Sequence, residues 1–286
     1  MANYDPQPVV SANSKGFDFA PQTRVAAPFT ESNMTWVEVE NSTAADWAGF
    51  YLTYLADTGV SAPAGIFFVA TGAASSEVRI ATVPMTTSRS VPLIDIFIPI
   101  PIASGTRISV SATAEGGSSL RGQIIGVLSA DFDAEPTYTA FECGPFNLAA
   151  SAEYGKWVPV DPGGTTNTKG SYTEISQTSH TNNVLNGDSL ANTYDYFGFM
   201  LNTNWNSAMG FAWTLADLAT GAASSEAIYA ADATLRHSVA EQSAYATPIM
   251  TKMSGAASGA RISARSQCSI TDATDRVIGV LLFGVR

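Results

Sequence analysis

The sequence predicts an all-β protein built from two tandem, homologous, antiparallel β-sandwich domains of the jelly-roll type. Three observations lead to this prediction. The chain repeats part of itself, its apolar residues fall in short runs separated by Gly, Pro, Ser and Asp, and several runs alternate apolar with polar residues. At 286 residues the chain is also longer than one ordinary domain.

The internal repeat is the strongest of the three observations. The heptapeptide TGAASSE at 71–77 recurs without change at 220–226. Weaker matches follow in the same order along both halves, with small changes in spacing: 35–39 with 171–175, 49–52 with 198–201, 105–109 with 259–263, and 125–128 with 278–281. Changes in spacing between strands indicate insertions in surface loops, so the two halves are expected to share one fold.

The repeat also defines the predicted domains. The first sandwich is expected at 31–150 and the second at 171–286, and the Gly, Pro and Thr content of 151–170 is typical of a linker. Residues 1–30 are polar, contain proline and show no clear periodicity, so we expect an extended N-terminal arm that orders against a neighbouring subunit. An alternating segment at 138–142 is expected to add one strand that bridges the two copies.

Seven runs in the first copy are predicted strands, because they are short and rich in β-branched and aromatic residues. In chain order they are TWVEVE, WAGFYLTYL, AGIFFVAT, EVRIATV, VPLIDIFIPI, TRISVSATA and GQIIGVLSA. The alternation at 36–40 and 107–111 places one face of each strand on a core and the other in water. Seven strands at this spacing are typical of a sandwich or jelly roll.

One segment of the second copy conflicts with this pattern. Residues 213–246 are rich in Ala, Leu and Glu, and propensity alone favours a helix there. The matching segment of the first copy is β-branched and contains glycine and proline. Because homologous copies share a fold, we predict a strand, a loop and a strand over 213–246.

The charge balance bears on possible partners. The chain has 14 Lys and Arg against 25 Asp and Glu, a formal charge of −11, which disfavours nucleic acid and anionic lipid surfaces. No apolar stretch approaches the roughly 20 residues of a membrane helix, so no membrane insertion is expected. The first residues lack the basic start and apolar core of a signal peptide, which predicts synthesis in the cytoplasm. Cys143 and Cys268 are expected to be reduced and buried.

The sequence offers little for catalysis, and we predict no enzyme and no cofactor. The chain has two histidines, His180 and His237, and neither recurs in the other copy, so both are expected in solvent. The TGAASSE segment resembles a phosphate loop only in its small residues, since it lacks a following Lys-Ser or Lys-Thr, and we expect a tight strand connection. A glycan-cleaving enzyme, in which two distant carboxylates converge, is the lowest ranked of three functional hypotheses.

One acidic cluster and one aromatic loop are the candidate binding sites. Alternate carboxylates at Asp131, Asp133 and Glu135 are of a type that binds a hard cation, but the cluster lacks the glycine and further acids of a calcium loop. We favour a solvated strand end there and predict no metal site, and the sequence leaves cation binding open.

The aromatic loop surrounds Trp205, an indole flanked by amide side chains that suit exposure and contact with sugar hydroxyls. Those amides are Asn202, Asn204 and Asn206. Most other aromatic residues, among them Trp213, Tyr51 and Tyr54, are expected in the core.

Several motifs of the repeat together resemble a module found in structural proteins of tailed bacteriophages. In the first copy these are TWVEVENSTAAD at 35–46, GAASSEV at 72–78 and GTRISV at 105–110, and in the second SYTEIS at 171–176, GAASSEA at 221–227 and GARISARSQ at 259–267. The resemblance implies a virion component of a tail, fibre or capsid decoration that acts through copies of itself and other virion proteins. The second-ranked hypothesis is a carbohydrate-binding module that attaches to a host-surface glycan.

Overall fold

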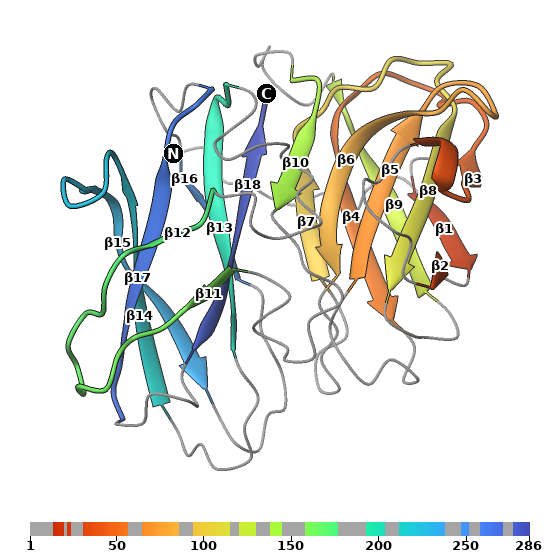
Figure 1. Ribbon diagram of the computed structural model, residues 1–286. Helices are drawn as coiled ribbons and strands as arrows, with labels where there is room; N and C mark the ends of the chain where they lie inside the picture. The colour runs from red at the N-terminus through yellow and green to blue at the C-terminus, as the bar shows by residue number, and fades with distance from the viewer. Residues whose placement is uncertain are drawn as a thin grey trace, which may run out of the picture.

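The computed structural model is all-β, as predicted (Figure 1). It describes residues 14–19, 22–23, 31–56, 65–85, 94–114, 120–129, 138–144, 158–176, 193–203, 212–237, 247–251, 258–270 and 277–286. Within these ranges the chain has no α-helix, and Glu31–Asn33 form a 3-10 turn. No helix in the described part of the chain is long and apolar enough to cross a bilayer.

The strands of the first half are β1 (Ser14–Phe19), β2 (Gln22–Thr23), β3 (Val37–Glu40), β4 (Trp47–Ala56), β5 (Gly65–Thr71), β6 (Val78–Met85), β7 (Ile94–Ile98), β8 (Ile108–Ala114), β9 (Leu120–Leu128) and β10 (Phe141–Gly144). Those of the second half are β11 (Val158–Val160), β12 (Thr173–Glu174), β13 (Tyr196–Thr203), β14 (Ala212–Thr220), β15 (Ala227–His237), β16 (Thr247–Thr251), β17 (Ile262–Cys268) and β18 (Ile278–Val285).

Each copy of the repeat is a sandwich of two sheets. In the first copy the sheet β1-β9-β4-β7 faces the strands β6-β5-β8, with β3 and β2 paired to the far side of β8. In the second copy the strands β18-β13-β16, with β11 on β18, face the sheet β12-β17-β14-β15. The matched segments of the two copies therefore form strands in the same order, and the alanine-rich segment predicted as strand, loop and strand is β14 and β15.

The two sandwiches are joined through one ten-stranded sheet. Strand β10 lies between β6 of the first copy and β18 of the second, where Phe141 pairs with Ala81 on one side and with Val285 on the other. Figure 1 shows β10 and β18 between the two sandwiches. The expected bridging strand is confirmed, and it begins at Phe141.

Strand β18 is buried on both of its faces. Its residues Ile278, Val280 and Leu282 belong to the core of the second copy, while the alternate residues, Leu281, Phe283 and Val285, pack into the core of the first. The sequence IGVLLFGV is apolar or small at every position, which is typical of a strand covered on both sides. The C-terminal strand therefore belongs to two hydrophobic cores at once.

This burial explains a difference from the sequence alignment. The segments 125–128 and 278–281 match in sequence, but they do not occupy equivalent places, because Gly49 pairs with Val127 whereas Gly198 pairs with Phe283. A strand with polar residues on one face has a fixed register, and β9 turns Arg121 outward in this way. Strand β18 has no polar face, so its pattern leaves the register to its neighbours.

Two segments predicted outside the domains contribute strands to them. Residues 14–19, in the predicted N-terminal arm, form β1 and pair with β9 of the same chain. Phe17 is buried there, with its ring centroid 5.2 Å from that of Phe67. In the predicted linker 151–170, β11 pairs with β18 and buries Val158 and Val160 in the second core. Apolar side chains within these polar segments supply the burial that orders them.

Candidate functional site

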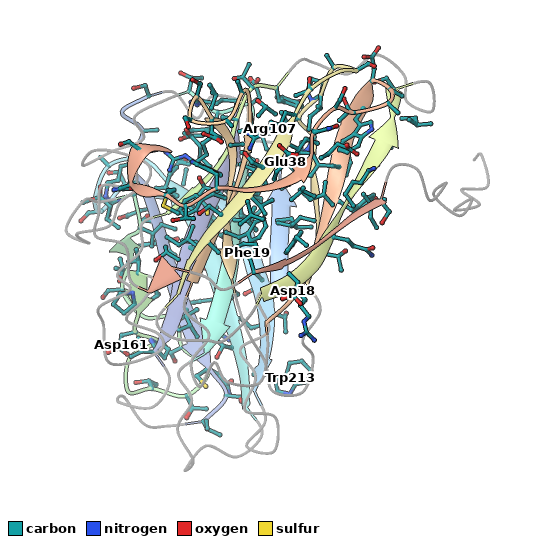
Figure 2. All side chains as sticks on the ribbon, turned by 90° about the vertical axis from the view of Figure 1, so that its right-hand side faces the viewer. Asp18, Phe19, Glu38, Arg107, Asp161 and Trp213 are labelled. Atoms are coloured by element: carbon teal, nitrogen blue, oxygen red, sulfur yellow. The ribbon has the colours of Figure 1, made fainter. Side chains whose placement is uncertain are left out.

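The TGAASSE turn of the first copy is held by Arg107, the residue just before β8. The Arg107 guanidinium donates Nε–H to Glu38 Oε2 at 2.7 Å, and its Nη1 donates to the Gly72 carbonyl and to Glu77 Oε1, each at 3.1 Å. Figure 2 shows Arg107 and Glu38 side by side. The hydrogen bond to Glu38, ahead of the contribution of Glu77, raises the pKa of Arg107. The arginine therefore remains charged and fastens the turn to β3.

The second copy repeats this arrangement. The Arg261 guanidinium donates to Glu174 Oε2, to the Gly221 carbonyl and to Glu226 Oε1 at distances between 3.0 and 3.1 Å. Gly72 and Gly221 have φ of +107° and +105°, a left-handed conformation that favours glycine. The turn is a tight strand connection, as predicted. Its glutamate serves as an internal ion-pair partner.

A second polar cluster lies at the junction of the two copies. The Tyr194 hydroxyl donates to Glu142 Oε2 at 2.5 Å, and the Arg286 guanidinium donates to both carboxylate oxygens of Glu142, at 3.0 and 3.2 Å. The Tyr194 ring lies over Gly284, where an added Cβ would stand 2.5 Å from the ring. The hydrogen bond that the Arg286 guanidinium donates to Glu142 raises the pKa of Arg286. Strand β10 is thus tied to the second sandwich by side chains as well as by its backbone.

A third cluster covers the outer face of the sheet β12-β17-β14-β15. The Asp217 side chain is 3% exposed and accepts hydrogen bonds from Lys169 Nζ at 2.7 Å and from Arg265 Nε at 2.9 Å. Burial alone would raise the pKa of Asp217, but hydrogen bonds from Lys169, the Asp232 amide and Arg265 outweigh it and hold that pKa below its usual value. The Tyr172 ring packs 4.6 Å from the Arg265 guanidinium carbon.

Two aromatic residues expected in the core are exposed instead. Trp213, on the same face of β14 as Asp217, is 52% exposed, and Tyr51, on the outer face of β4, is 39% exposed and lies beside Phe97 with ring centroids 5.0 Å apart. Figure 2 shows Trp213 near the opposite end of the molecule from Arg107. The alternation Trp213, Leu215, Asp217 places the indole on the same side as a carboxylate, and that signal marks an outward face.

Most of the sequence-predicted site lies outside the described residues, and the remainder is not brought together. Trp205, Asn204, Asn206, His180 and the acidic cluster Asp131, Asp133 and Glu135 fall in segments that the structure does not describe. Asn202 lies near the end of β13, opposite Gly279, and His237 ends β15, opposite Ala212. Among the residues described, no group of three His, Cys, Asp or Glu side chains is placed to hold a metal ion.

Both cysteines are buried and free, as predicted. The Cys143 Sγ–H donates to the Thr82 carbonyl at 2.9 Å, and burial raises the pKa of this thiol well above its usual value. A thiol held in its neutral form is a poor nucleophile, so Cys143 has the properties of a core residue.

Comparison with known proteins identifies no family for this chain. No family model and no curated protein matches it. Among solved structures, it is similar to the tandem domain CBM22-1-CBM22-2 of Xyn10C from Paenibacillus barcinonensis, with 8% identity over 88% of this chain and 82% of that chain. The TM-score is 0.25, which is too low to carry an inference about function.

Proposed function

We propose that this chain is a structural component of a bacteriophage particle that acts through contacts with copies of itself and with other virion proteins. The observation that carries the proposal is the ten-stranded sheet shared by both repeats, in which β18 is buried on both faces. The repeat motifs supply the phage context through their resemblance to structural modules of tailed phages.

The shared sheet matters because tandem domains move relative to each other by default. Relative motion is suppressed where the interface between domains is large and hydrophobic. Here the interface is a continuous sheet with apolar residues on both sides of β18, reinforced by Glu142, Tyr194 and Arg286. A subunit that must hold its contact surfaces at a fixed separation benefits from such a joint, whereas an enzyme of two hinged domains does not.

The test is whether the chain is present in purified particles. Particles from cells that express the gene in its natural context are banded on a density gradient, and the chain is quantified by mass spectrometry against the major capsid protein. We expect a constant ratio across the particle band. If the chain stays at the top of the gradient with free cell proteins, the proposal is wrong.

Glycan attachment is the second candidate, and the exposure of Trp213 favours it. An exposed indole offers a flat apolar surface for the face of a sugar ring. On the same face, Gln267 of β17 lies opposite Leu215, between the indole and the pair Asp217 and Arg265, so amide and charged groups border the ring. We expect Trp213→Ala to abolish binding on a glycan array, while Tyr51→Ala, a matched exposed aromatic on the other sandwich, leaves it unchanged. A wild-type protein that binds no glycan would remove this candidate.

Trp205, the loop residue that the sequence predicts as a sugar contact, is tested in the same assay. Trp205→Ala separates the predicted amide-flanked site from the face around Trp213, because only the variant at the true contact loses binding. If both variants bind as the wild type does, neither indole is a sugar contact.

A further inference from the structure

Strand β15 forms an edge of its sheet, as far as the described strands go. In the described part of the chain, β15 pairs only with β14. Its residue Ile228 is 51% exposed, and Ala227 and Ala231 are exposed as well. An accessible strand edge presents unpaired N–H and C=O groups and is a site where another strand can add.

The equivalent edge of the first copy is already occupied. The repeat matches β6 to β15, since Val69 pairs with Ala81 where Leu218 pairs with Ala230. On β6, Ala81 also pairs in parallel with Phe141 of β10, and Ala81, Thr82 and Val83 are fully buried. The same position on β15 has no such partner among the described strands, and Ala230 is partly exposed.

The other end of the chain carries a strand that corresponds to β10. Strand β10 runs antiparallel to β18, the last strand of the second repeat. Strand β1 runs antiparallel to β9, the last strand of the first repeat, and is the edge of its own sheet. Its outward residues Gly16 and Asp18 are exposed. Among the described strands β1 pairs with β9 alone, so its other edge is the counterpart of the edge of β10 that pairs with β6.

Strand orders make the correspondence complete. The shared sheet reads β3-β8-β5-β6 from the first copy, then β10, then β18-β13-β16 from the second. The sheet β12-β17-β14-β15 matches β3-β8-β5-β6 strand for strand, and the sheet β1-β9-β4-β7 matches β10-β18-β13-β16 in the same way. The chain thus contains one joined sheet and the two separate halves of another.

We propose that these halves join between molecules, so that β15 of one copy pairs in parallel with β1 of a second copy. This inference rests on the proposed role as an assembling subunit and names the strands that would carry assembly. The β14–β15 ladder shifts register on both sides of Leu218 and Asp232 has φ of +54°, so the regular edge of β15 is Ala233–His237. The register of β10 on β6, carried over to the other two strands, places the start of β1 beside this edge, near Thr234. Such a contact is heterologous, and it builds a ring or a filament according to whether the rotation closes.

Crosslinking between two variants, each with one added cysteine, tests the pairing. The variants are Thr234→Cys on the β15 edge and Gly16→Cys on β1, where an added Cβ would meet only the Gly122 carbonyl, at 3.8 Å. Both native cysteines are buried, so the wild type serves as the unreactive control. With a short, flexible bis-maleimide, we expect dimers in a mixture of the two variants, none in either variant alone, and a ladder or a closed ring from the double variant.

Two results would overturn the pairing. Crosslinked dimers of Thr234→Cys alone would show that the edge pairs with itself about a two-fold axis, and an uncrosslinked mixture would show that the edges do not meet. A chain that is present in particles but gives no crosslink refutes this inference and leaves the proposed function standing. A chain that crosslinks but is absent from particles supports the pairing and refutes the proposed function.

A charge on the edge gives an independent measurement without crosslinking. Lysine on an edge strand disfavours addition of a further strand. We expect Thr234→Lys to reduce the mass measured by light scattering to that of the monomer, while Ala222→Lys, at an exposed position in the turn before β15, leaves the oligomer unchanged. Circular dichroism of both variants verifies that they are folded, and equal masses for folded Thr234→Lys and wild type would count against the pairing.

Discussion

Phe283→Ala should destabilise the first sandwich, although Phe283 belongs to the last strand of the second. The side chain is 1% exposed and packs in the core of the first copy, with its ring stacked on that of Phe141 at a centroid distance of 5.6 Å. Truncation of a buried phenylalanine to alanine costs about 3–5 kcal/mol in unfolding free energy. The neighbouring Leu282→Ala, which faces the second core, costs about 2–5 kcal/mol and is the matched control.

Hydrogen exchange followed by mass spectrometry distinguishes the two variants by location. Because adjacent residues of β18 face different cores, Phe283→Ala should speed exchange in peptides from β5 and β6 of the first copy, and Leu282→Ala should speed exchange in β14 and β17 of the second. Total unfolding free energies from urea titration verify that both variants lose comparable stability. If Phe283→Ala leaves the first copy as protected from exchange as in the wild type, the two sandwiches do not share β18. The argument that the shared sheet holds them at a fixed separation then fails.

Three further predictions concern the polar clusters and the junction. Arg107→Met should lower the free energy of unfolding in urea by about 1.5–3 kcal/mol, because it leaves the nearly buried Glu77 carboxylate without its partner. Arg121→Met, which removes an exposed ion pair, should cost at most about 1 kcal/mol, and equal costs would contradict this reasoning. Folding lowers the pKa of Asp217, so the stability that its carboxylate contributes is present above the unfolded pKa of about 3.9 and is lost as pH falls through the folded value. We therefore expect the melting temperature of Asp217→Asn to drop less than that of the wild type between pH 7 and 3. Gly284→Ala should cost about 1–3 kcal/mol in calorimetry, since its methyl group meets the tyrosine ring at the junction, while Gly164→Ala, in open space, should unfold like the wild type.

The sequence was sufficient for those parts of the fold that local patterns determine. The fold class and the strand-loop-strand structure of the alanine-rich segment follow from short apolar runs and from comparison of the two copies, because the repeat outweighs the helical propensity of Ala, Leu and Glu. The bridging strand at Phe141 follows from its alternation. The tight turn follows from residues that lie next to one another in the chain, with Gly72 supplying the left-handed conformation.

Features that depend on distant partners were not accessible from the sequence. The register of β18 differs from that of β9 because an apolar residue fits either face. The ion pair of Asp217 joins Lys169, in the predicted linker, to a strand 48 residues further along the chain, and no local pattern indicates that contact. The exposure of Trp213 depends on which face of its sheet meets the core, and the indole alone does not reveal the side.

The two copies have diverged in a way that follows from the position of each in the molecule. The turn and its arginine are nearly identical in both, because every contact lies within one repeat. The outer sheet faces differ: Phe68, packed among buried residues, occupies the place that Asp217 fills in the second copy with its two cations. A phenylalanine suits a face that is covered, and a paired carboxylate suits a face at the boundary with water. The edges differ in the same sense, since β10 pairs with β6 whereas β15 pairs only with β14 among the described strands. Each repeat is thus adapted to its neighbours, and the edge that β10 occupies in the first repeat is the edge at which we propose that a second copy binds in the other.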